Sequence, residues 1–390
     1  MRNAYILAAC RTPGCKAKKG KLKDVRPDDL AAAAIKGLMV KSGASPSDVE
    51  DIIIGCAFPE GEQGMNFARV AAMKAGMPVE APAQTVNRFC SSGLQAIASA
   101  AERIMAGFAD CIIAGGSESM SMIPIGGARY SANPSLVADW PESFASMGIT
   151  AEIVAEKFGI TRVDQDIFAA ASHAKAAAAI AAGKFRDEII PVEAERCTLL
   201  NGKILRSTEL VDADDGVRGD TTVDGLGKLK TPFKAAGTVT AGNSSQMTDG
   251  AAAVLVVSEE YLKRTGKKAL ARFVAFAVKG VPPEIMGIGP VAAIPAALKL
   301  AGLSLEDIGL FELNEAFAAQ SLACIKELGI DASRVNVNGG AIALGHPLGC
   351  TGAKLTATLL HEMRRRDTRY GMVSMCIGGG MGAAGVFEKM

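Results

Sequence analysis

The order of segments in the first third of the chain recurs in its last third, and this repetition limits the fold more than any other feature. Each third carries a helical stretch, a short apolar strand, a helix, a strand that contains Val-Asn, a second helix and a buried strand ending near Gly-Gly. The matched segments are 29–42, 52–55, 86–87 and 111–116 in the first third, and 291–301, 309–313, 335–336 and 373–379 in the last. Alternating strands and helices predict two α/β halves with largely parallel sheets, packed around a pseudo-twofold axis.

The middle of the chain departs from this pattern. It is rich in Met, Pro, Asp and Gly, it contains the only tryptophan, Trp140, and it shows one clear amphipathic helix, 164–182. We therefore predict an inserted loop subdomain that covers the site. The expected parts are an N-terminal half at 1–117 plus 250–270, the inserted subdomain at 118–249, and a C-terminal half at 271–390.

Charge and cysteine content exclude several classes of protein. A net charge of +1 over 390 residues argues against a nucleic-acid-binding or anionic-membrane-binding surface. The nine cysteines include no Cys-x-x-Cys pair, so the sequence suggests neither a disulfide framework nor a zinc site. No apolar run is long enough for a signal peptide or a membrane span. We expect a cytoplasmic protein.

One cysteine, Cys90, lies in a segment that suggests chemistry. It occurs in Asn-Arg-Phe-Cys-Ser-Ser-Gly, 87–93, directly before a helix with apolar residues on one face, and Ser91 or Ser92 is expected to cap that helix. A helix N-terminus favours the thiolate, so the segment predicts a reactive cysteine with a low pKa. A buried structural cysteine is the alternative that this segment leaves open.

Two glycine-rich segments near the C-terminus carry further candidates. His346, one of three histidines, lies in segment 339–352 before a second helix, and Cys376 lies where a buried strand enters the glycine turn of segment 371–382. An incidental loop histidine and a packing cysteine are the alternatives. Because the repeat places Cys90 and His346 in equivalent loops, we expect them to meet near the ends of the strands.

Together these segments resemble the thiolase family. The resemblance covers essentially the whole chain through six motifs in order: 87–93, Gly-Gly-Ser-Glu-Ser-Met-Ser at 115–121, Thr-Ala-Gly-Asn-Ser-Ser-Gln at 240–246, Asn-Glu-Ala-Phe-Ala at 314–318, Gly-His-Pro-Leu-Gly at 345–349 and Cys-Ile-Gly-Gly-Gly-Met-Gly at 376–382. It implies duplicated halves that form a layered α-β-α-β-α core. It also implies thiolytic cleavage of 3-ketoacyl-CoA by CoA through an acyl-cysteine. CoA is then a substrate, and neither a cofactor nor a metal is expected.

The resemblance assigns roles to five residues. Cys90 is the nucleophile, His346 activates it, and Cys376 is the general acid and base. His346 and a water held by Asn314 face the enolate oxygen, while the backbone N–H groups of Cys90 and Gly378 face the tetrahedral oxyanion. From the local sequence alone, a helix N-cap is the favoured interpretation of Asn314.

The resemblance also indicates which residues of this chain face CoA. Six match positions along the pantetheine channel: Met147, Phe233, Ala241, Ser245, Ala316 and Phe317. Arg218 matches a position near the nucleotide, although the acidic residues interleaved around it favour a solvated face over a phosphate site.

One difference from the short-chain biosynthetic thiolases indicates the subtype of this chain. Ser146-Met147-Gly148 stands where short-chain biosynthetic thiolases tend to have His-Met-Gly, which favours a degradative enzyme of β-oxidation with broad chain length. A short-chain acetoacetyl-CoA thiolase is the alternative. A decarboxylating ketoacyl synthase would need a second catalytic histidine where Asn314 stands, and a non-catalytic lipid-carrier relative would be expected to lack Cys90 or His346.

The resemblance also bears on partners. It implies 3-ketoacyl-CoA, CoA and acetyl-CoA as ligands and a homodimer or homotetramer. It leaves open an association with a hydratase–dehydrogenase subunit. We expect no nucleic-acid partner and no membrane span.

Overall fold

The computed structural model describes residues 2–200 and 203–390. The N-terminal half contains β1 (Ala4–Arg11), β2 (Cys15–Lys16), α1 (Pro27–Ser42), β3 (Asp51–Gly55), α2 (Phe67–Ala75), β4 (Ala83–Val86), α3 (Ser92–Met105), β5 (Cys111–Ser119), β8 (Thr248–Ser258) and α8 (Glu259–Thr265). The C-terminal half contains β9 (Ala271–Gly280), α9 (Gly289–Ala301), β10 (Ile308–Leu313), α10 (Ala318–Leu328), α11 (Ala341–Leu344), α12 (Thr351–Arg366), β11 (Tyr370–Ile377) and β12 (Met381–Lys389).

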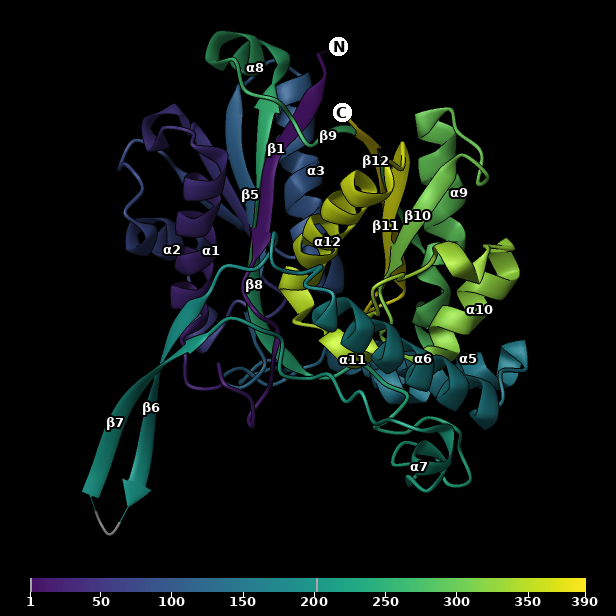
Figure 1. Ribbon diagram of the computed structural model, residues 1–390. Helices are drawn as coiled ribbons and strands as arrows, with labels where there is room; N and C mark the ends of the chain where they lie inside the picture. The colour runs from purple at the N-terminus through teal and green to yellow at the C-terminus, as the bar shows by residue number, and fades with distance from the viewer. Residues whose placement is uncertain (1, 201–202) are drawn as a thin grey trace.

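These elements form five layers, as predicted. Figure 1 shows α1 and α2 outside the strands of the first half, α3 and α12 between the two sets of strands, and α9 and α10 outside the strands of the second half. The strand order is β10-β11-β12-β9-β1-β8-β5-β3-β4, with β2 added on β8. The two halves join where Ala4–Ile6 of β1 pairs with residues 271–273 of β9. Separate apolar cores fill the outer interfaces, and a third surrounds the central helices.

The sheet is mixed, which corrects the expectation of largely parallel strands. β3 pairs parallel with β4 and β5, and β10 pairs parallel with β11, whereas β8 and β12 run antiparallel to their neighbours. The link from β11 to β12 is only the glycine turn 378–380. Such a short connection allows a hairpin and not a parallel crossover.

The second Val-Asn segment also differs from the expectation of a strand. Val335 forms a single isolated bridge with Phe311, whereas Val86 belongs to β4. Asn336 has φ of 45°, and its side chain accepts from Leu313 N–H and donates to Leu313 O. The Asn336 side chain thus takes the place of a strand ladder at this position.

The inserted subdomain contains α4 (Pro134–Asp139), α5 (Met147–Phe158), α6 (Arg162–Ala181), β6 (Val192–Leu200), β7 (Lys203–Val211) and α7 (Val223–Gly227). The helix predicted at 164–182 is confirmed as α6. The β6–β7 hairpin, which projects from the body in Figure 1, was not predicted. The sequence offers one signal for it, the Asn-Gly dipeptide at 201–202, which is a common turn between the strands of a hairpin. The boundaries at 117/118, 249/250 and 270/271 stay a prediction.

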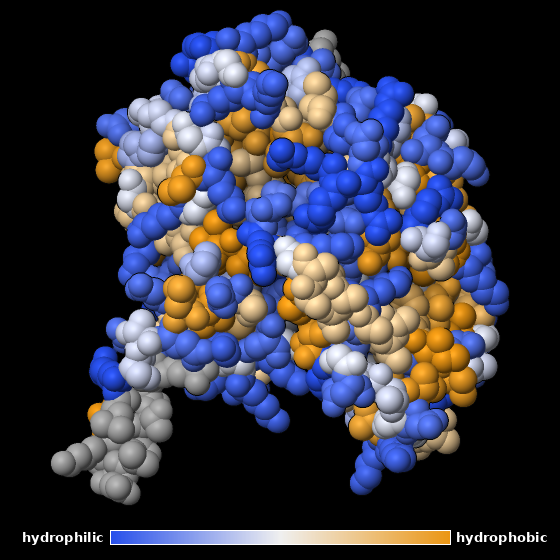
Figure 2. All heavy atoms as spheres, viewed as in Figure 1, coloured by the Kyte–Doolittle hydropathy of each residue, from blue (hydrophilic) through white to orange (hydrophobic). Residues whose placement is uncertain are grey.

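The surface is mostly hydrophilic on the face drawn in Figure 2, and apolar side chains gather at its lower right, over α10 and α6.

Among the described residues, one helical stretch, Pro283–Ala301, is long and apolar enough to cross a membrane. It is kinked at Ile285, and its second part is α9, whose apolar side chains enter the core against β9 and β12. Packing on the sheet accounts for its composition.

Candidate active site

Cys90 lies in a tight turn between β4 and α3. Phe89, directly before it, has φ of 42°, a region that non-glycine residues rarely adopt. The turn is held by Asn87 Oδ1, which accepts from Phe89 N–H at 2.9 Å, and by Ser92 Oγ, which donates to Phe89 O at 2.7 Å. Neither Ser91 nor Ser92 makes the expected N-cap bond, because the Ser92 hydroxyl serves this turn instead. The turn therefore fixes Cys90 at the start of α3 with 7% of its surface exposed.

His346 is held from both sides of its ring in the turn between α11 and α12. Its Nδ1 lies 2.6 Å from Thr351 Oγ1, and its Nε2 lies 3.3 Å from Asn314 Nδ2. Since the Thr351 hydroxyl donates its single hydrogen to Pro347 O at 3.0 Å, it accepts from Nδ1–H. Nε2 is then the unprotonated nitrogen, and Asn314 donates to it. This tautomer leaves a base at Nε2.

Cys376 and Gly378 lie at the end of β11. Cys376 is fully buried and packs against Met286 and Ala316. The backbone N–H of Gly378 acts on the Cys90 thiol and lowers its pKa, so the amide that the family resemblance assigns to the oxyanion lies beside the predicted nucleophile. The structure thus brings Cys90, His346, Asn314, Cys376 and Gly378 together from four separate segments.

Burial dominates the protonation of this group. Burial raises the pKa of Cys90 to about 11, although the N–H groups of Gly378 and Cys90 lower it. The prediction of a low-pKa thiol is therefore wrong for this resting site, because loss of solvation outweighs the donors at the helix start. Burial, and next the Cys90 sulfur, raises the pKa of Cys376 well above its ordinary range. Burial and then the Lys354 charge lower the pKa of His346 to about 3. At neutral pH all three side chains are uncharged.

A cavity of about 700 Å³ opens in front of these residues. Cys90 and His346 lie in its wall, and all six residues predicted along the pantetheine channel line it: Met147, Phe233, Ala241, Ser245, Ala316 and Phe317. Ser146 also lines it. Asn314 and Cys376 lie behind the wall, against His346 and Ala316. The lining is mostly apolar, as suits an acyl chain or a pantetheine arm.

Arg218 does not line this cavity. It is exposed, its backbone N–H donates to His173 Nδ1 at 3.1 Å, and its Nη2 lies 3.4 Å from His173 Nε2. His173 is fully buried on α6, and burial followed by the Arg218 charge lowers its pKa to about 4. The predicted contact of Arg218 with the nucleotide stays a prediction.

Two buried side chains that the sequence reasoning missed hold the His346 turn. Glu118 accepts from Ala57 N–H at 2.7 Å and from Gly349 N–H at 2.8 Å, which ties the turn to the N-terminal half. Lys354 on α12 donates to Leu344 O and Gly345 O at 2.7 and 2.9 Å. Glu118 lies in the motif at 115–121, so the sequence did carry a sign that it matters to the site. For Lys354 the sequence carries no such sign, because a single lysine in an amphipathic helix is typical of an exposed surface residue.

Comparisons with known proteins agree with this geometry. The family model described as "Thiolase, N-terminal domain" matches residues 4–260, and "Thiolase, C-terminal domain" matches residues 267–389. The 3-ketoacyl-CoA thiolase of Bacillus subtilis (strain 168) is 57% identical over 389 residues, with 100% of each chain covered.

Solved structures show the same fold. The Bacillus anthracis acetyl-CoA acetyltransferase superposes with a TM-score of 0.91 at 41% identity, covering 100% of this chain and 99% of the other. Human mitochondrial 3-ketoacyl-CoA thiolase in complex with CoA superposes with a TM-score of 0.89 at 40% identity, covering 100% and 98%.

Proposed function

The chain belongs to the thiolase family, and we propose that within it this protein is a 3-ketoacyl-CoA thiolase, which cleaves 3-ketoacyl-CoA with CoA in β-oxidation. One observation carries the proposal: Cys90 and His346 share the wall of an apolar cavity, with Cys376 packed directly behind it. A thiol nucleophile suits the reaction, because its acyl thioester is close in energy to acyl-CoA. The transfer therefore stays reversible.

The first half-reaction makes the acyl-enzyme. His346 Nε2 takes the Cys90 proton as the sulfur attacks the 3-keto carbon, and the N–H groups of Cys90 and Gly378 donate to the resulting oxyanion. The C2–C3 bond then breaks. Its electron pair passes to acetyl-CoA as an enolate, which takes the Cys376 proton at C2. Acetyl-CoA leaves, and the shortened acyl group stays on Cys90.

The second half-reaction returns the enzyme to its starting state. The Cys376 thiolate takes the proton of incoming CoA, and the CoA sulfur attacks the Cys90 thioester. The bond from the acyl carbon to Cys90 breaks, acyl-CoA forms, and Cys90 recovers its proton from His346. The Asn314 Oδ1 atom is buried without a protein partner among the described residues, which suits a bound water facing the enolate oxygen.

In this proposal CoA is a substrate, and no other cofactor takes part. The protein is a cytoplasmic homodimer or homotetramer, and an association with a hydratase–dehydrogenase subunit stays open. The cytoplasmic assignment draws support from eight free cysteines among the described residues. Size-exclusion chromatography with light scattering tests the oligomeric state.

A short-chain acetoacetyl-CoA thiolase is the second candidate, because the acetyl-CoA acetyltransferase structure superposes equally well. Ser146 favours the first candidate, since a serine on the cavity wall leaves more room for an acyl chain than a histidine. The lipid-carrier alternative is disfavoured, because Cys90 and His346 are both present and share one cavity.

The test is the rate of thiolysis with acetoacetyl-CoA, 3-ketooctanoyl-CoA and 3-ketohexadecanoyl-CoA. We expect the rate to hold or rise with chain length. Activity confined to acetoacetyl-CoA would move the protein to the short-chain class. Absence of activity with all three substrates would contradict the catalytic assignment.

A further inference from the structure

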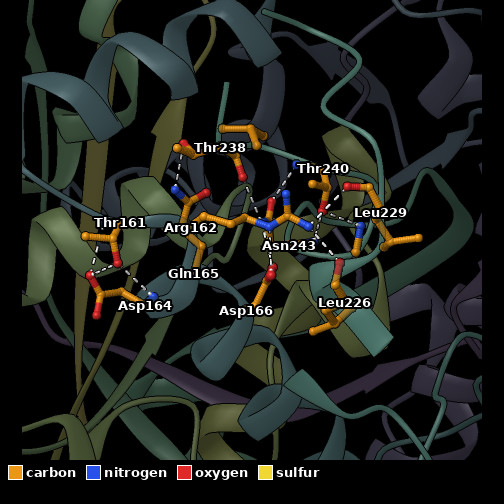
Figure 3. Close-up of polar contacts among 12 residues, drawn as sticks. Thr161, Arg162, Asp164, Gln165, Asp166, Leu226, Leu229, Thr238, Thr240 and Asn243 are labelled. Carbon is orange, nitrogen blue, oxygen red and sulfur yellow. Dashed lines mark hydrogen bonds and ion pairs between the residues drawn. The ribbon is translucent and has the colours of Figure 1, made fainter. Parts of the chain in front are cut away.

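A buried carboxylate on α6 lies at the junction of segments that form the cavity wall. Asp166 is 2% exposed, and each of its oxygens accepts one hydrogen bond. Oδ2 accepts from Arg162 Nε at 2.7 Å, and Oδ1 accepts from Asn243 Nδ2 at 3.0 Å. Figure 3 shows the Asp166 carboxylate next to the Arg162 and Asn243 side chains, with dashed lines marking these contacts.

Arg162 extends the junction to the segment after α6. Its Nη2 donates to Leu226 O at 2.6 Å and to Leu229 O at 3.2 Å, as the dashed lines in Figure 3 show. These carbonyls lie at the end of α7, from which the chain runs directly to Phe233 in the cavity wall. The guanidinium thereby fixes the start of one wall segment.

Asn243 extends the junction to two other wall segments. Its Oδ1 accepts from Thr240 N–H at 2.8 Å, and its backbone O accepts from Ala318 N–H at 2.9 Å. Close by, Ser245 N–H donates to Ala316 O at 2.9 Å. Backbone bonds thus align Ala241 and Ser245 with Ala316 and Phe317, and the Asn243 side chain that Asp166 holds fixes the turn that makes these bonds.

We propose that Asp166 is a positioning residue for the CoA arm, because it links three wall segments through Arg162 and Asn243. The inference rests on the proposed function, which makes this cavity the CoA channel. Arg162, Asp166 and Asn243 are not among the residues that line the cavity, so the effect passes through the wall segments and not through contact with substrate.

A carboxylate is needed at this position because both neighbours are donors. In Asp166→Asn one oxygen becomes an NH₂ group, which then faces the donor of either Arg162 or Asn243. The volume is unchanged, but one buried donor loses its acceptor. Because Cys90 and His346 lie on other elements, the chemical step should be spared while CoA is held less well.

The experiment compares the full-length protein with Asp166→Asn and Arg162→Met. The second variant keeps the test valid if the first folds poorly, because the Arg162 side chain is 22% exposed. The matched control is Glu259→Gln, which removes another i,i+4 ion pair, exposed on α8 with Lys263 at 2.7 Å. KM for CoA and kcat are measured, together with the CoA concentration that half-protects Cys90 from iodoacetamide.

We expect KM for CoA and the half-protecting concentration to rise about tenfold in both variants, with kcat little changed. The rate of Cys90 alkylation without CoA and the control variant should match the wild type. Unchanged protection, or a fall in kcat at unchanged KM, would overturn the inference. If CoA fails to protect the wild type, the proposed function fails, and this inference fails with it.

Discussion

The Cys90 thiol lies at the start of α3, where the Gly378 N–H lowers its pKa, yet burial raises that pKa to about 11. Burial likewise lowers the pKa of its proposed base, His346, to about 3. In the resting site the pair is a neutral thiol and a neutral imidazole. At the scale of single residues, solvation therefore decides the charge state of the resting site.

The raised pKa of the Cys90 thiol predicts how the rate of its alkylation depends on pH. Because the raised pKa leaves little thiolate at neutral pH, the rate of Cys90 alkylation by iodoacetamide should keep increasing above about pH 9, where a free cysteine levels off. Mass spectrometry of the Cys90 peptide separates this thiol from the others. A plateau below about pH 8 would contradict the prediction.

The roles proposed for Cys90 and Cys376 predict that acylation can persist when thiolysis is lost. Cys376→Ala should lower thiolysis by about 10²–10⁴-fold, because no acid remains for the enolate carbon. The burst of acylation at Cys90 by p-nitrophenyl acetate should persist. Cys324→Ser, another buried cysteine whose sulfur lies 3.5 Å from Gly287 O, is the control and should retain thiolysis. Full thiolysis in Cys376→Ala would exclude the two-cysteine mechanism.

At the scale of elements, the approach of α3 and α12 brings the two halves of the site together. Each helix begins directly after a loop that carries a proposed catalytic residue, and glycines form the contact between them. A Cβ at Gly352 would lie 2.3 Å from Leu94 N, and one at Gly93 would lie 2.8 Å from Ala353 N. Backbone contact at this crossing thus sets the separation of Cys90 and His346.

Filling that contact should destabilise the protein. Gly352→Val forces the two helices apart, so we expect the free energy of unfolding to fall by about 1–3 kcal/mol or more, with a lower rate of thiolysis. Urea denaturation measures the first effect. Gly227→Ala is the control, because its Cβ would enter open space, and it should change the free energy by less than about 0.5 kcal/mol. Wild-type stability in Gly352→Val would mean that the crossing is not tight.

At the scale of the whole molecule, a buried ionic network joins all three parts of the chain. Arg11 at the end of β1 donates to Glu188 at 2.6 Å and to Asp214 at 2.7 and 2.9 Å, and both acids belong to the inserted subdomain. Glu188 also accepts from Thr358 on α12 at 2.9 Å. The charges are almost fully buried, so the network fixes the inserted subdomain over both halves.

Breaking this network should cost much more than breaking a surface pair. Arg11→Met leaves two buried carboxylates without their cation, and we expect a loss of about 3–5 kcal/mol in the free energy of unfolding near neutral pH. Arg2→Met is the control, since its partner Asp110 is exposed and the expected loss is below about 1 kcal/mol. A loss in Arg11→Met no larger than in the control would contradict this role.

The same variant predicts a pH dependence. Burial opposes ionisation of Asp214, but the Arg11 charge prevails and holds the pKa of Asp214 below its ordinary value. A lowered pKa stabilises the fold above the unfolded-state value of about 3.9, and this contribution is lost as the pH falls. The gap in stability between wild type and Arg11→Met should therefore narrow as the pH is lowered below about 4, as an acid series of urea denaturation curves would show.

Much of the site was predictable because its signals are local. The glycine turns and helix starts around Cys90, His346 and Cys376 are written in short segments, and the repeat of those segments indicates which loops meet. The two α/β halves follow from the alternation of strands and helices, whereas the five layers came from the resemblance to a family. The six channel residues came from motifs that resemble a family, and the cavity wall contains all six.

The tertiary structure decided what depends on distance and solvation. The sequence places Cys90 at a helix start, but only the surrounding atoms show that desolvation outweighs that position and raises the pKa. The hydrogen bond from Asn243 to Asp166 joins residues 77 positions apart in the chain, and the burial of Lys354 depends on the elements packed around it, so no local pattern encodes either. Local patterns thus determined the elements and the reactive residues. Burial determined the protonation of those residues, and long-range contacts determined which side chains hold them in place.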